Sequence, residues 1–126
     1  MFRFEELSVW QKAIEFMDKV YEVTEDFPTG ERFGITSQLR RAAVSISANI
    51  AEGSSRVSNK DFSRFVEIAY GSLCETVSLL LFAKRRQLLA AERHAVLYSD
   101  AEELARMLSS LRNSLGKWKR EQPGSE

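Results

Sequence analysis

The chain has 126 residues, and 18 basic and 18 acidic side chains give it a formal net charge of zero. Its length fits one domain with a hydrophobic core, and its charge balance speaks against binding of nucleic acid or membranes through net charge alone. One cysteine and one histidine leave no disulfide framework and no zinc motif. The N-terminal segment lacks the apolar core of a signal peptide, and the longest purely apolar run, 79–83, is too short to span a membrane. We therefore expect a cytoplasmic protein.

The first predicted helix covers residues 8–26. Ser8 and Gln11 fit an S-x-x-Q capping box at its start, and apolar residues follow at helical spacing until Pro28 prevents continuation. After the linker FPTGERFG, a second helix is expected over 35–53, with Gly53 as its C-cap.

The third predicted helix, 58–89, begins with Ser58 as N-cap and Asp61 three residues later. It carries two apolar rows, which indicates a central position or a contact between subunits. The fourth, 91–120, has apolar residues at alternating intervals of four and three, a heptad pattern, and 121–126 are expected as a frayed tail. These elements predict an all-α, up-down-up-down antiparallel four-helix bundle in one domain, 1–126.

A row of polar side chains lies beside the apolar face of the second helix. If the second and third helices pack antiparallel about a turn near residue 56, facing residue numbers sum to about 113, which pairs Arg41 with Ser72. We predict a hydrogen-bonded seam without a ligand that fixes the register of the two helices. Gly71 is expected to let the backbones approach closely there. The predicted seam consists of Gln38, Arg41, Ser45, Asn49, Glu52, Ser72 and Glu75.

No set of residues supports catalysis or metal binding. A di-iron bundle needs two Glu-x-x-His units, whereas His94 is the only histidine and is interpreted as a polar residue in the first turn of the fourth helix. Cys74 is expected to be a small core residue, and no glycine-rich phosphate loop is present. We therefore predict a protein without enzymatic activity and without a cofactor.

Basic residues gather at one pole of the expected bundle, where the windows 1–12, 52–64 and 112–126 contain nine basic and six acidic residues. Basic side chains near helix C-termini also complement the helix dipole, which is the simpler interpretation. As contacts for phosphate groups, the candidates at this pole are Arg56, Lys60, Arg64, Arg112, Lys117, Lys119 and Arg120.

The runs FEELSVWQKA, FPTGERFGITSQLRRAAVSISANIAEGSSR and SNKDFSRFVEIAYGSLCET resemble the bacterial "four helix bundle" proteins. These include proteins encoded in intervening sequences of 23S ribosomal RNA genes and the accessory variability protein of diversity-generating retroelements. The resemblance implies a cytoplasmic homopentamer shaped like a short barrel, with no known enzymatic activity. For the retroelement branch it implies contact with a reverse transcriptase and RNA through a strongly basic surface. This chain departs from that branch because its net charge is zero.

Two functions remain open at this point. The favoured one is a homo-oligomeric scaffold or adaptor that binds protein, and the alternative is an RNA-binding accessory protein that uses the basic pole. The second apolar row of the third helix would expose a patch that soluble monomers avoid, so we expect a cyclic oligomer to cover it. The pentamer follows from the resemblance. The expected interface residues are Ile68, Leu79 and Phe82.

Overall fold

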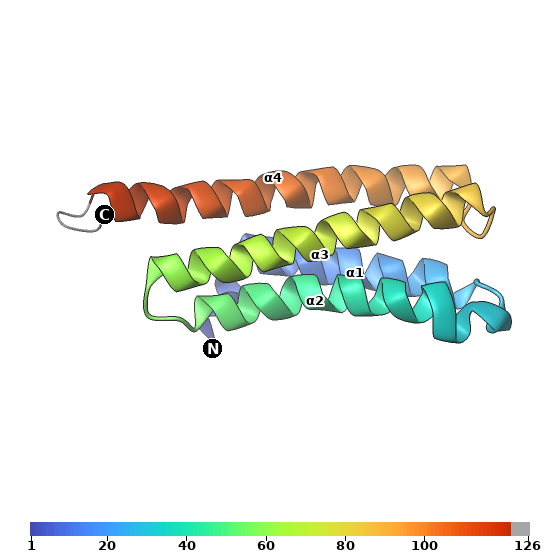
Figure 1. Cartoon of the computed structure of the whole chain (residues 1–126), viewed down its shortest axis with the longest axis horizontal. Coiled ribbons are helices and arrows are strands. Elements are labelled where there is room, and N and C mark those ends of the chain that lie inside the picture. Colours follow the sequence, from blue (N-terminus) through green and yellow to red (C-terminus); the bar gives the residue numbers. More distant parts are fainter. Residues whose placement is uncertain (122–126) are drawn as a thin grey trace.

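Four long helices pack side by side and antiparallel in a computed structural model that describes the backbone of residues 1–121 and the side chains of residues 1–116 (Figure 1). Within the described residues there is no strand, so the predicted all-α antiparallel four-helix bundle is confirmed. Three short helical turns, η1 to η3, precede α1 and α2. The elements are η1 (Arg3–Glu6), α1 (Ser8–Glu25), η2 (Thr29–Glu31), η3 (Arg32–Thr36), α2 (Ser37–Ser54), α3 (Asn59–Arg85) and α4 (Ala91–Glu121).

Each helix packs on its neighbours in chain order, and α1 closes the bundle against α4. The apolar stripes read from the sequence form the core, including the heptad positions of α4 up to Leu115. The largest fully buried side chains come from all four helices and include Phe16, Leu39, Ile46, Ile50, Phe62, Leu80, Leu104 and Leu108.

The third helix ends at Arg85, four residues before the predicted end. Gln87 has a φ of 61°, its backbone N–H donates to the Lys84 carbonyl, and that of Leu88 donates to the Ala83 carbonyl. These two bonds form a Schellman motif, which ends a helix with a left-handed residue. The sequence did not predict this motif, because glycine usually occupies the left-handed position and glutamine does so rarely.

The predicted N-cap of α1 is wrong, whereas that of α3 is confirmed. Ser8 lies inside α1, whose N-cap is Leu7 without a side-chain bond. Gln11 donates instead to the Glu5 carbonyl at 2.8 Å, because the η1 turn places that carbonyl within reach. At α3, the predicted cap is present, with the Asp61 backbone N–H donating to Ser58 Oγ at 3.1 Å.

Gly53 is a packing residue inside α2 and not the cap that we predicted, since α2 continues to Ser54. A Cβ atom at Gly53 would lie 2.7 Å from the Cβ of Phe65 and 2.9 Å from the Cδ1 of Phe62. A non-bonded Cβ atom essentially never lies this close to another heavy atom. The absence of a side chain at Gly53 therefore sets how near α2 comes to α3.

A cluster of ion pairs joins α1 to α4. Lys19 Nζ lies 2.6 Å from Asp100 Oδ2, and Lys12 Nζ lies 3.3 Å from Asp100 Oδ1 and 3.1 Å from Glu103 Oε2. Burial of Asp100 favours its neutral form, but the hydrogen bonds from Lys19 and Lys12 outweigh burial and hold the pKa of Asp100 below its ordinary value.

His94 lies in the first turn of α4, as predicted, but it is buried, with 6% of its surface exposed. Its ring centroid is 5.7 Å from that of Tyr98, and its Nε2 atom has no hydrogen-bond partner among the described residues. Burial, and then the positive charge of Lys84, lower the pKa of His94. The imidazole is therefore neutral at neutral pH.

Substituting Gly53 by alanine tests the close approach of α2 and α3. We expect Gly53→Ala to lower the free energy of unfolding by about 1–2 kcal/mol, because overpacking outweighs the gain in helix propensity. Gly116→Ala is the matched control: nothing lies within 4 Å of its Cβ position, so this variant should gain about 0.5–1 kcal/mol. Urea unfolding measures both, and a more stable Gly53→Ala protein would contradict the contact.

The pH dependence of stability tests the burial of His94. The unfolded chain binds a proton at this side chain below about pH 6.5, whereas the folded chain, with its lowered pKa, does so only at lower pH. The free energy of unfolding should therefore fall as the pH drops from about 6.5 towards the folded pKa and level off below it. His94→Gln removes this titration. Its loss of stability between about pH 7 and pH 5.5, followed by urea unfolding, should be smaller than that of the unsubstituted protein; equal losses would show that His94 is not the group responsible.

Candidate functional site

The centre of the predicted polar seam is present between α2 and α3. The hydroxyl groups of Ser45 and Ser72 share a hydrogen bond of 2.8 Å. Asn49 Nδ2 donates to the Ser45 carbonyl at 2.8 Å and to Ser45 Oγ at 3.0 Å. Thr76, which is not among the predicted members of the seam, donates to the Ser72 carbonyl at 2.8 Å. The seam is thus a short chain of neutral groups.

The register differs from the prediction by one helical turn, because Ser45 and not Arg41 faces Ser72. Ser58 is extended, with φ −97° and ψ 147°, so the chain travels further along the bundle before α3 begins. Figure 1 shows the first turn of α3 reaching beyond the end of α2. The close approach predicted at Gly71 is also wrong: nothing lies within 4 Å of its Cβ position, and the close approach is at Gly53.

The remaining members of the predicted seam are exposed and form no hydrogen bond between α2 and α3. Glu52 accepts a bond from Arg56 at 3.0 Å within the turn. Arg41 lines a groove on the outer side of α2. The exposed members are Gln38, Arg41, Glu52 and Glu75.

Of the three predicted interface residues, two are exposed on α3 and one packs partly on the core. Ile68 is 47% exposed and Phe82 is 51% exposed, whereas Leu79 packs partly on the core. An 18-residue stretch of α3 has a mean hydropathy of 1.5, apolar and long enough by composition to cross a membrane, yet only 28% of it is buried. Within the bundle, α3 packs between α2 and α4. One chain alone therefore leaves much of its most apolar helix uncovered.

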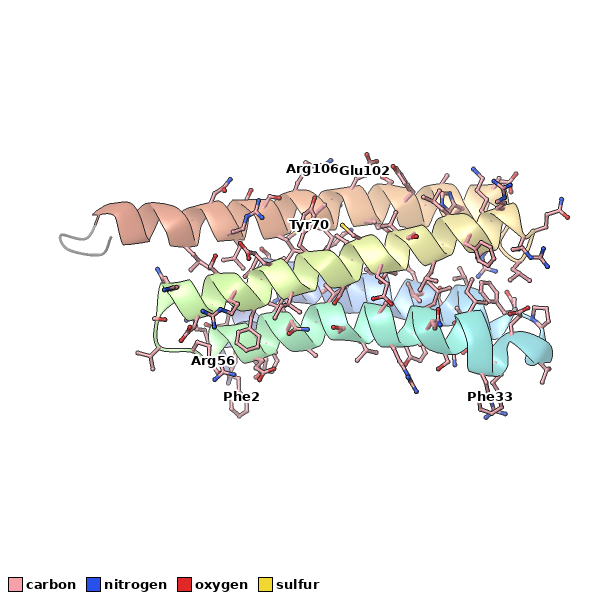
Figure 2. All side chains as sticks on the ribbon, viewed as in Figure 1. Phe2, Phe33, Arg56, Tyr70, Glu102 and Arg106 are labelled. Atoms are coloured by element: carbon pink, nitrogen blue, oxygen red, sulfur yellow. The ribbon has the colours of Figure 1, made fainter. Side chains whose placement is uncertain are left out.

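A second apolar surface lies on the other side of α3, in a groove of about 420 Å³ between α3 and α4. Cys74 is exposed in this groove, so the prediction of a core cysteine is wrong: its place on α3 faces the gap to α4 and not the interior. Tyr70 of α3 and Glu102 of α4 both line the groove, and Figure 2 shows Tyr70 between these two helices. Other lining residues are Leu73, Val77, Leu81 and Tyr98.

The predicted basic pole divides into two parts. The guanidinium of Arg56 lies 4.7 Å from the centre of the Phe65 ring and pairs with Glu52. Lys60 and Arg64 line a separate groove of about 340 Å³ against the end of α4. Arg112 is exposed on α4, and the side chains of Lys117, Lys119 and Arg120 lie outside the described residues.

Arg3 also lies at this pole, although it is not among the predicted phosphate-contact residues. Its guanidinium lies 5.3 Å from the centre of the Phe62 ring and donates to the Ser54 carbonyl at 3.3 Å. The alternation of phenylalanine and arginine in residues 2–4 was the available signal. Within the part of the chain described here, no group of His, Cys, Asp or Glu side chains could hold a metal ion.

Comparisons with known proteins agree with the resemblance of the motifs within residues 4–76. The family model described as "23S rRNA-intervening sequence protein" matches residues 5–110. Among solved structures, the chain is similar to a protein with unknown function from the S23 ribosomal protein family of Bacteroides thetaiotaomicron VPI-5482. The TM-score is 0.77 and the identity 25%, over 83% of this chain and 95% of that chain. No curated protein matches the chain. Since the family model spans most of its length, the chain belongs to the 23S rRNA-intervening sequence protein family.

Proposed function

We propose that this protein is a non-enzymatic, cytoplasmic scaffold that assembles into a ring of identical subunits. The observation that carries the proposal is the exposed apolar surface of α3, with Ile68 at 47% and Phe82 at 51% exposure. Together with the low burial of the most apolar stretch of α3, this exposure favours a contact with another protein surface. A second copy of the chain is the simplest partner that is always present to cover it.

A ring is favoured because α3 has two different uncovered surfaces. Ile68 and Phe82 lie on its outward side, while Leu81 and Tyr98, 46% and 41% exposed, lie at the groove towards α4. A contact between two unlike surfaces is heterologous, and heterologous contacts end only by closing into a ring. Five subunits are proposed from the family resemblance.

The mass in solution tests this assembly. A pentamer of the 14.4 kDa chain has a mass of about 72 kDa, which multi-angle light scattering measures at micromolar concentration. Ile68→Glu should lower the mass towards that of one chain, because an interface does not bury an unpaired carboxylate without a large cost. Val57→Glu is the matched control, since Val57 is fully exposed in the α2–α3 turn and outside the patch.

Two results would contradict the proposal. A 14.4 kDa species of the unsubstituted protein would exclude the ring. An unchanged mass for Ile68→Glu would place the contact on another face.

A second candidate function is RNA binding at the basic pole. The observation in its favour is that Lys60 and Arg64 line one groove and form no ion pair among the described residues. Glu67 lines the same groove and reduces its positive potential. A ring would repeat the groove in every subunit, which would strengthen binding through several weak contacts.

Charge removal at this groove tests RNA binding. The double variant Lys60→Gln/Arg64→Gln should bind structured RNA more weakly in a gel-shift assay at ~50 mM salt, and the salt dependence of its affinity should fall by about one unit of slope for each lost phosphate contact. Arg106→Gln, an exposed charge on α4, serves as the control. If the unsubstituted protein fails to shift RNA at this salt concentration, RNA binding at the basic pole is contradicted, and the scaffold remains of these two candidate functions.

A further inference from the structure

A groove of about 510 Å³ runs over the outer side of the first half of α2. Tyr21 of α1 and Phe33 of η3 stand at its sides, and α2 forms its floor. Phe33 is 92% exposed, and Figure 2 shows it projecting from the bundle beside α2, at the end opposite to Phe2. The volume lies in the range of ligand-binding sites.

The groove is strongly basic. Three arginines line it, Arg32, Arg40 and Arg41, and no acidic side chain is among its described lining residues. None of the three forms an ion pair within the described part of the chain. Such a concentration of unpaired guanidinium groups favours an anionic ligand, because each presents a planar fork that matches a phosphate or carboxylate.

One of these arginines is fixed in place and the other two are available. Arg40 Nε donates to Thr24 Oγ1 at 2.9 Å, and its guanidinium lies 4.5 Å from the centre of the Tyr21 ring. Arg32 lies 5.7 Å from the centre of the Phe33 ring without a hydrogen bond to a described residue, and Arg41 also has none. The groove thus combines a rigid charge with two adaptable ones.

A buried hydroxyl at the groove also lacks a partner. Thr36 lines the groove and is 7% exposed, and its Oγ1 atom forms no hydrogen bond among the described residues. Buried polar atoms are nearly always hydrogen-bonded in folded proteins. The atom itself is covered by protein, so the case for a ligand rests on the arginines and on the exposed ring of Phe33.

We propose that this groove binds a nucleotide, with a phosphate held by Arg32 and Arg41 and a base stacked on the exposed ring of Phe33. A phosphate alone would contact the arginines but would leave the rings of Tyr21 and Phe33 without a ligand group to pack on. An apolar peptide would use the rings but would leave three positive charges uncompensated. A nucleotide satisfies both, because aromatic rings stack on any base and guanidinium groups bind phosphate bidentately. The site does not depend on the proposed ring and lies away from the basic pole.

Direct binding to the assembled protein tests the proposal, with three probes. Isothermal titration calorimetry measures inorganic phosphate and AMP, and fluorescence anisotropy measures a short fluorescein-labelled polyuridine strand. Phe33→Ala should weaken nucleotide binding about fivefold or more, and Arg41→Gln about tenfold. Phe2→Ala and Arg106→Gln are the matched controls, each removing an exposed ring or charge elsewhere (Figure 2), and should change the dissociation constant by less than about twofold.

The probes and variants separate the outcomes. Binding of AMP identifies a free nucleotide as the ligand, and binding of the polyuridine strand alone identifies a nucleotide within a single strand; both support the site. Equal affinity for inorganic phosphate and AMP would overturn the stacking of a base. Loss of binding in Arg56→Gln but not in Arg41→Gln would assign the ligand to the basic pole and overturn the groove. A changed mass of Phe33→Ala in light scattering would show that this surface is a contact between copies, and the proposal would fall.

Discussion

The close contact of α2 with α3 at Gly53 determines which surfaces the bundle presents. With no side chain at Gly53, the ring of Phe62 and the Cβ of Phe65 fill the space that a Cβ atom would need. One turn further into the bundle, Asn49 bonds to Ser45, which in turn bonds to Ser72. These contacts fix the rotation and the level of α3 against α2. A shift of one turn would separate both hydroxyl groups and press a larger residue against Phe65.

This register has a consequence for the apolar face of α3. Helices with one apolar stripe hide it in a four-helix bundle, but α3 has apolar residues around more of its circumference. The core takes Phe62, Val66 and Leu80, while the seam to α2 is already filled by Ser72 and its partners. Ile68 and Phe82 are therefore turned outward and cannot be covered by α2. The exposure of these two side chains thus follows from the packing of α3 on its neighbours and not from the rotamer of one side chain.

The sequence was sufficient for the class of fold because each helix repeats its apolar residues over several turns, and many positions agree. The sequence was insufficient where the backbone conformation of a single residue determines the end of a helix or the register of two helices. Gln87 ends α3 in a left-handed conformation that a sequence rule assigns to glycine. The extended backbone of Ser58 shifts the pairing of α2 and α3 by a full turn, and no periodicity records such a shift. The shifted pairing also explains why the predicted contact at Gly71 and the predicted cap at Gly53 are both wrong: the close contact of α2 with α3 lies at Gly53.

The sequence did not predict the groove over α2, because its lining residues come from three separate elements, α1, η3 and α2. The net charge of the whole chain also gives no information about a local cluster of charges. The chain is neutral overall, which argues against non-specific attraction of polyanions. At physiological salt, however, a charge acts mainly within a distance of about 8 Å. Asp100 is paired with Lys12 and Lys19, whereas Arg32 and Arg41 form no ion pair among the described residues. Local recognition of an anion is thus compatible with zero net charge, provided that the ligand is small enough to bind within one groove.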